Sequence, residues 1–227
     1  MRPNPNILKR WLLVMAYATA MAWVESAAVV YLRTVVGAID PYQPNSTPDL
    51  GQLTWVEIVR EAATLVMLFS VGWLAGETWR SRLGYTLIAF GWWDIAYYIF
   101  LKPMCGWPHS IWDWDILFLI PLPWWGPVIA PAAIAVLMIA CGTLIAAFDQ
   151  PGAPVWPSRR ATALNLAGIA LALYVFMSDA IRALPRGADA VRAARPAHFN
   201  WPLFLVALAF MAVPLVDLTG QARRRGR

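Results

Sequence analysis

Acidic residues lie inside several long apolar stretches of this chain, where a charged side chain is costly. Glu25, Glu61, Asp94 and Asp179 each fall in a different stretch. An ionised group inside a bilayer costs roughly 2.5 kcal/mol or more on insertion scales, so each of these acids needs a partner or a purpose. A desolvated acid without a cationic partner takes up a proton or a cation. The four carboxyl groups are therefore the chain's main indication of binding or chemistry.

Helical spacing gives two of the acids polar company. Asp94, Tyr97 and Tyr98 are related as i, i+3 and i+4, which places them on one face of a helix. A second face of this kind, at i, i+4 and i+7, holds Glu57, Glu61 and Thr64. Each of the two acids, Asp94 and Glu61, thus has polar side chains beside it on its own helix.

Arginines near the acids are too few to neutralise them. Arg60 adjoins Glu61 but points about 100° away on a helix, so we expect it to pair with a carboxylate of another helix. Asp179 and Arg182 can pair at i, i+3. Arg33 and Arg182 also lie where they could reach lipid headgroups. The candidate acids outnumber these three arginines; they are Glu25, Glu61, Asp94, Asp115 and Asp179.

Composition places all these residues in a membrane protein. Of the 227 residues, 60% are hydrophobic and only 14% are charged, a balance that a water-soluble domain could not carry on its surface. The net charge of +5 comes from basic residues at the ends of apolar runs, where they orient helices in a bilayer, so nucleic acid is not an expected partner. We predict an all-α polytopic membrane protein with a single membrane domain, residues 1–227.

Six transmembrane helices are predicted, each near the roughly 20 residues that cross the hydrocarbon core. They lie at about 8–32, 56–76, 83–101, 125–147, 162–182 and 201–218. The first apolar run is too long for the core of a signal peptide, so we interpret it as an uncleaved helix.

Basic residues predict the orientation of these helices. Eleven Lys and Arg residues fall on one side of the predicted spans and six on the other. Because the richer side faces the cytoplasm, both termini are expected there, in a bacterial-type inner membrane. On this topology all four intramembrane acids lie in the outer half of the bilayer.

The least regular stretch, around 107–127, separates the third and fourth predicted spans. Ser110 and Asp113 have the spacing of a capping box and predict a short helix, which Pro121 and Pro123 should end. Such a piece would be either interfacial or re-entrant. Irregular backbone at membrane depth is tolerated only where it meets protein or a water-filled cavity. We therefore expect it to roof or line a pocket, with Asp115 pointing into it.

Three functions remain open on this evidence. The leading hypothesis is transporter-type binding of a cation or small solute at an outward-facing acidic site, formed by Glu25, Arg60, Glu61, Asp94, Tyr97, Tyr98, Asp115 and Asp179. A divalent cation, if one is bound, would be held by Glu25, Glu61 and Asp94. The first alternative is an accessory subunit of a larger membrane complex, or an oligomer, in which the charges are structural. The second is an intramembrane enzyme acting on a lipid or periplasmic substrate, although no catalytic motif supports it, so we expect a non-enzyme.

Overall fold

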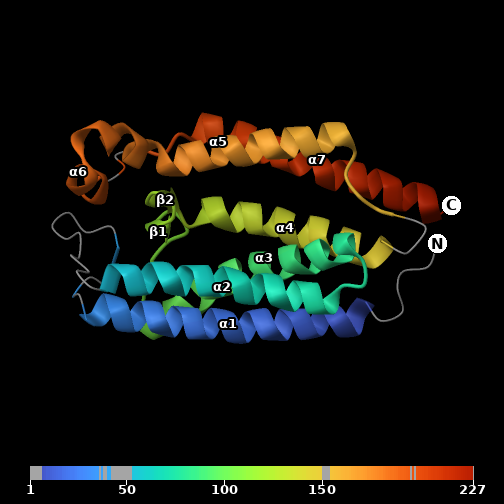
Figure 1. The fold of residues 1–227 in the computed structure, drawn as a ribbon, viewed down its shortest axis with the longest axis horizontal. Coiled ribbons are helices and arrows are strands. Elements are labelled where there is room, and N and C mark those ends of the chain that lie inside the picture. The colour runs from blue at the N-terminus through green and yellow to red at the C-terminus, as the bar shows by residue number, and fades with distance from the viewer. Residues whose placement is uncertain are drawn as a thin grey trace.

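Long helices make up most of the computed structural model, which describes residues 7–35, 37, 40–41, 53–149, 154–194, 196 and 198–226 (Figure 1). In chain order the elements are α1 (Ile7–Val35), α2 (Leu53–Ala75), α3 (Trp79–Cys105), β1 (Trp114–Phe118), β2 (Trp124–Pro127), α4 (Ile129–Phe148), α5 (Arg159–Ala183), the 3-10 turn η1 (Leu184–Arg186), α6 (Ala188–Arg192) and α7 (Trp201–Gly226).

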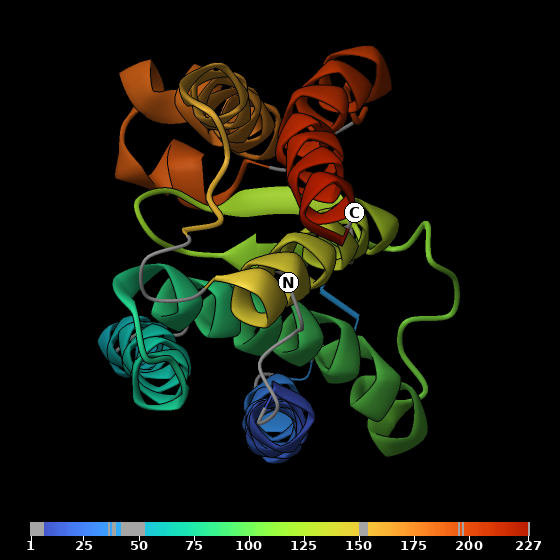
Figure 2. The same ribbon diagram turned by 90° about the vertical axis from the view of Figure 1, so that its right-hand side faces the viewer.

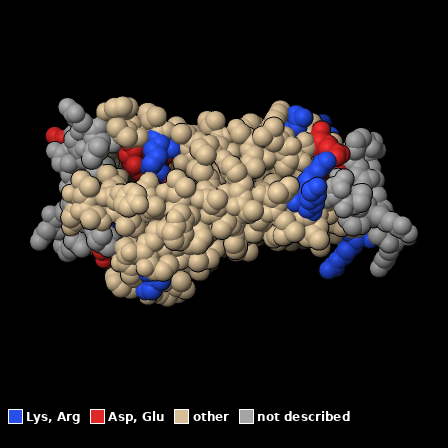
Figure 3. All heavy atoms as spheres, turned by 90° about the horizontal axis from the view of Figure 1, so that it is seen from below, with Lys and Arg blue, Asp and Glu red and all other residues tan. Residues whose placement is uncertain are grey.

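Five of the described helices are long and apolar enough to cross a membrane, which confirms the predicted all-α polytopic class. They are α1, α2, α4, α5 and α7. Figure 3 agrees with this class, because charged side chains on the face it shows lie toward the two ends and the middle is free of them. Helix α1 begins and α7 ends at the same end of the bundle (Figure 1).

The third predicted span, α3, is long enough to cross at 27 residues, but it lacks an apolar, nearly uncharged stretch like those of the other five helices. It packs against α1, α2 and α4. A helix covered by its neighbours presents less surface to lipid, so it can carry more polar residues than the others. The total of six spans stays a prediction.

Glycines let α3 approach its neighbours closely. A Cβ at Gly84 would lie 2.9 Å from the carbonyl oxygen of Gly142 in α4, and one at Gly142 would lie 2.4 Å from the carbonyl oxygen of Gly84. On the other side, a Cβ at Gly72 of α2 would lie 2.4 Å from the backbone nitrogen of Thr86. Small residues commonly form such close contacts between membrane helices. Helix α3 is thereby held against both α2 and α4.

The helices form two groups with α4 and the strands between them, as the end view shows (Figure 2). Helices α1, α2 and α3 lie on one side, and α5 and α7 lie on the other. Hydrogen bonds tie α1 to α3 and to α4, since Trp92 Nε1 of α3 donates to Thr19 Oγ1 at 2.8 Å and Trp11 Nε1 donates to Thr143 Oγ1 of α4 at 3.2 Å. The first group provides most of the residues of the candidate site.

The irregular segment at 107–127 is confirmed, but the short helix predicted within it is wrong. Strands β1 and β2 pair antiparallel, with Asp115 opposite Gly126 and Ile116 opposite Trp125. Ser110 Oγ accepts a hydrogen bond from the Trp112 amide at 3.2 Å, so its hydroxyl stabilises a turn instead of capping a helix. Because 124–127 is a strand, α4 begins at Ile129 and not at the predicted 125. We call residues 114–127 the hairpin.

Candidate functional site

A cavity of about 150 Å³ lies among α1, α2, α3 and the first strand of the hairpin. It brings together seven of the eight residues predicted to form the site: Glu25, Arg60, Glu61, Asp94, Tyr97, Tyr98 and Asp115. The remaining one, Asp179, does not line it. We call the end of the bundle that holds this cavity the hairpin end.

Acids outnumber arginines among the described residues that line the cavity. The acids are Glu25, Glu57, Glu61, Asp94 and Asp115, and the arginines are Arg33 and Arg60. The net charge of the cavity therefore depends on which of these carboxylates the two arginines pair with.

Arg60 is committed to two carboxylates at once. Its Nε donates to Glu57 Oε2 at 2.8 Å, its Nη2 contacts the other oxygen of Glu57, and its Nη1 donates to Glu25. Glu25 Oε2 also accepts a hydrogen bond from Thr64 Oγ1 at 3.1 Å. The predicted pairing of Arg60 with an acid of another helix is thus confirmed, and it links α1 to α2.

Arg33 pairs with Asp115 rather than reaching only for lipid headgroups. Arg33 Nη2 lies 2.9 Å from Asp115 Oδ1, the guanidinium lies 4.5 Å from the centre of the Trp107 ring, and Asp115 is only 1% exposed. Asp115 Oδ1 also accepts the Ile116 amide at 2.9 Å. A buried ion pair with further hydrogen bonds fixes the hairpin to α1.

Glu61 contacts the hairpin through a hydrogen bond from a backbone amide and not through an ion pair. The Leu119 amide donates to the Glu61 carboxylate, at 3.2 Å from Oε2 and 3.3 Å from Oε1. Within the described parts of the chain, Glu61 forms no ion pair. It is also only 8% exposed. A buried carboxylate with one hydrogen-bond donor retains acceptor capacity for another group.

Asp94 has even fewer partners. Its Oδ2 atom is buried and accepts no hydrogen bond from any described residue, and it makes no ion pair with them. The adjacent Trp93 also lines the cavity, and its indole N–H has no acceptor among the described residues. Unsatisfied buried polar atoms are rare in folded proteins and call for an explanation such as a bound ligand.

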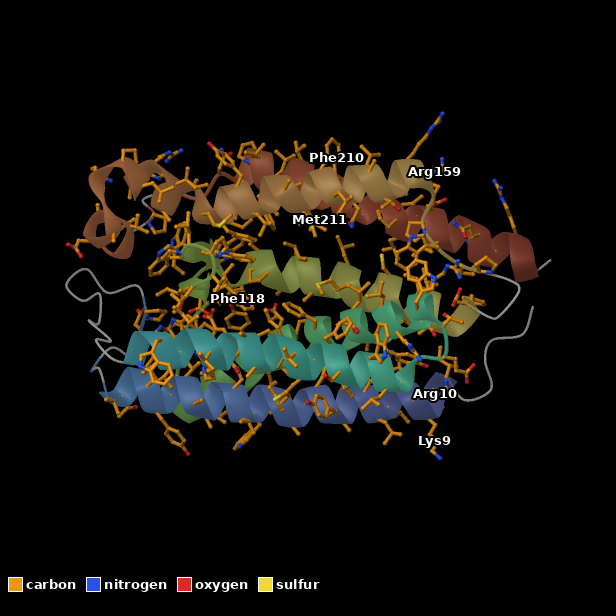
Figure 4. The ribbon with its side chains drawn as sticks, in the orientation of Figure 1. Lys9, Arg10, Phe118, Arg159, Phe210 and Met211 are labelled. Atoms are coloured by element: carbon orange, nitrogen blue, oxygen red, sulfur yellow. The ribbon has the colours of Figure 1, made fainter. Side chains whose placement is uncertain are left out.

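Aromatic rings form another part of the cavity wall. The Trp93 and Tyr97 ring centres are 6.4 Å apart, those of Tyr97 and Tyr98 are 5.0 Å apart, and those of Trp93 and Phe118 are 6.5 Å apart. Phe118 enters from the hairpin, at the end of the bundle opposite Arg10 (Figure 4). The cavity thus combines carboxylates with ring faces, to which organic cations are attracted.

Asp179 is at the hairpin end of α5 and is not brought to the cavity. Its Oδ1 lies 3.5 Å from Arg182 Nη1, which confirms the predicted pairing at i, i+3. The arginine side chain is 70% exposed. Asp179 therefore belongs to a surface pair on the other helix group.

Some lining residues were not among the predicted site residues. Glu57 and Thr64 are one helical turn from Glu61, so their spacing indicated them. Arg33, Trp93 and the hairpin residues 116–119 carried no such signal, because they reach the cavity through tertiary packing.

The described residues contain no group of three or more His, Cys, Asp or Glu side chains arranged to hold a metal ion. The proposed trio of Glu25, Glu61 and Asp94 lines one cavity, but it does not converge as a metal centre.

Comparisons of the chain with protein-family models, with curated proteins and with solved structures found no match. The functional interpretation below therefore depends on the geometry of the cavity.

Proposed function

We propose that this chain is a multispan inner-membrane protein whose cavity, at the outer side of the membrane, binds a small organic cation, as a transporter does. The observation that carries this proposal is the pair of carboxyl groups, Glu61 on α2 and Asp94 on α3, that line one cavity and form no ion pair with any described residue. A ligand with an ammonium group supplies the missing charge and hydrogen-bond donors.

Size and lining favour an organic cation over a metal ion. A cavity of about 150 Å³ is comparable to the engineered protein cavity that holds benzene. An ammonium group near a Trp or Tyr face gains about 0.5–2 kcal/mol, and such faces are supplied by Trp93, Tyr97 and Tyr98. A small apolar molecule that carries a primary amine fits the cavity volume and supplies the ammonium group.

Calorimetric titration with benzylamine tests this function, with benzyl alcohol as the uncharged match. We expect Glu61→Gln and Asp94→Asn each to weaken benzylamine binding roughly tenfold to a hundredfold, because a hydrogen bond to a charged group contributes about 1.5–3 kcal/mol. Asp179→Asn, in an acid outside the cavity, should leave binding unchanged. Equal binding of the amine and the alcohol, or equal losses in all three variants, would sink the proposal.

Transport is tested separately, by uptake of labelled benzylamine into proteoliposomes. The intact protein should take up more than the Glu61→Gln, Asp94→Asn double variant. Uptake equal to that of the double variant, together with normal calorimetric binding, would make the protein a binding protein and not a transporter.

The outward placement of the cavity predicts the results of reporter fusions. Fusions after Arg82 and Arg160 should report the cytoplasm, and fusions after Gly51 and Arg192 should report the periplasm, because the basic residues favour that orientation. The reversed pattern would place the cavity in the inner leaflet.

A further inference from the structure

A second hollow lies at the end of the bundle opposite the hairpin, in the seam between α1 and α2. It is a groove of about 350 Å³, within the usual range of ligand pockets. Its lining combines apolar side chains with an ion pair: Arg10, Leu13, Val14, Val71, Leu74 and Glu77. None of these residues lines the cavity at the hairpin end.

The close contact of α2 with α3 accounts for the groove. Gly72 brings α2 to the backbone of α3, since a Cβ there would lie 2.4 Å from the Thr86 nitrogen. Helix α1 packs on α3 separately, through the Trp92 to Thr19 hydrogen bond. Two helices held by the same third helix leave a seam between them, and the groove occupies one end of that seam.

The walls of the groove suit a lipid chain. Val14 forms its floor at 1% exposed, whereas Leu13 and Leu74 form its rims at 61% and 84% exposed. Exposed leucines on membrane helices face the acyl chains of the bilayer. An acyl chain can therefore enter from the side.

The mouth of the groove carries both signs of charge. Arg10 Nη2 lies 2.6 Å from Glu77 Oε1, and Arg10 Nη1 donates to the Ala75 carbonyl at 3.3 Å. Arg10 is the more buried partner, with 29% of its side chain exposed against 52% for Glu77. A guanidinium has five N–H donors, so Arg10 retains donors for a phosphate. The carboxylate of Glu77, just past the C-terminal end of α2, favours a cation.

We propose that this groove binds a phospholipid with a zwitterionic, hydrogen-bonding headgroup, of the phosphatidylethanolamine type. Its acyl chain lies along Val14, Val71 and Leu74, its phosphate lies on Arg10, and its ammonium group lies on Glu77. The order of charges matches such a lipid, in which the phosphate is nearer the acyl chains than the ammonium is. The proposal is independent of the ligand of the hairpin-end cavity.

Native mass spectrometry of the purified protein tests this site, with equal amounts of dioleoyl phosphatidylethanolamine, phosphatidylglycerol and phosphatidylcholine added. The intact protein should retain severalfold more phosphatidylethanolamine than either other lipid. Arg10→Gln should remove the preference. Glu77→Gln should shift it toward phosphatidylglycerol, because Arg10 then lacks its acid. Phosphatidylcholine tests the hydrogen bond from the lipid ammonium group to Glu77, because its methylated ammonium has no N–H to donate.

Two further variants keep the test decisive. The exchange Arg10→Glu with Glu77→Arg preserves the ion pair and so the fold, but it reverses the order of charges and should remove the preference. Arg159→Gln is the matched control, an exposed arginine at the same end of the bundle on α5 (Figure 4), and should change nothing. Equal retention of all three lipids by the intact protein, or a loss in Arg159→Gln equal to that in Arg10→Gln, would overturn the assignment. So would displacement of the bound lipid by soluble phosphoethanolamine, which lacks acyl chains.

Discussion

Replacing Arg60 with methionine should lower the free energy of unfolding by about 3 kcal/mol, because it leaves two carboxylates without their shared cation. Arg60 contacts both Glu57 and Glu25, whose side chains are 14% and 9% exposed. The measurement is SDS titration in mixed micelles. Adding Glu25→Gln and Glu57→Gln to Arg60→Met should restore much of the lost stability, since none of these three positions then carries an unpaired charge.

The matched control for Arg60 is Arg182, which also pairs at i, i+3 with an acid but is 70% exposed. Arg182→Met should cost less than about 1 kcal/mol, as exposed ion pairs contribute little. A loss in Arg60→Met no greater than that in Arg182→Met would show that the Arg60 pairs do not hold α1 to α2.

Replacing Gly72 with alanine should destabilise the protein by about 3 kcal/mol, at the upper end of the usual cost of overpacking. The new Cβ would lie 2.2 Å from Thr86 Oγ1 and 2.4 Å from the Thr86 nitrogen, so α2 and α3 would have to separate. The same titration measures the effect.

A second glycine on a helix gives the control for Gly72. Gly220 lies in α7, and a Cβ there would meet nothing within 4 Å. Gly220→Ala should be neutral or stabilising by up to about 1 kcal/mol, because alanine is the better helix former. Equal effects of the two substitutions would contradict the close contact of α2 and α3.

The helices of this fold were predictable because the membrane imposes their length and composition on local sequence. The pairing of Asp179 with Arg182 was predictable for a similar reason, since both residues lie on one helix. The clustering of Glu25, Glu61 and Asp94 was predictable because the three residues lie at similar depths in the membrane, each on a different helix. Equal depth was not enough for Asp179, because α5 belongs to the other helix group (Figure 2).

The hairpin could not be predicted from its local sequence. Ser110 and Asp113 fit a helix cap and a turn equally well, and the choice depends on whether residues 114–118 find a strand to pair with. That strand, β2, follows Pro121 and Pro123, which we expected to end a short helix, and it overlaps the start of the fourth predicted span. The partner of Arg33 is Asp115, 82 residues away, and no spacing rule connects residues so distant.

Glu61 has two roles in this structure, and they are not independent. Its carboxylate accepts the Leu119 amide, while its remaining acceptor capacity faces the cavity. A ligand that draws on this carboxylate changes the strength of its bond to the hairpin, and by reciprocity the hairpin changes the affinity for the ligand. The Leu119 amide is thus an internal reporter, whose rate of hydrogen exchange should follow the occupancy of the cavity that Leu119 helps to line.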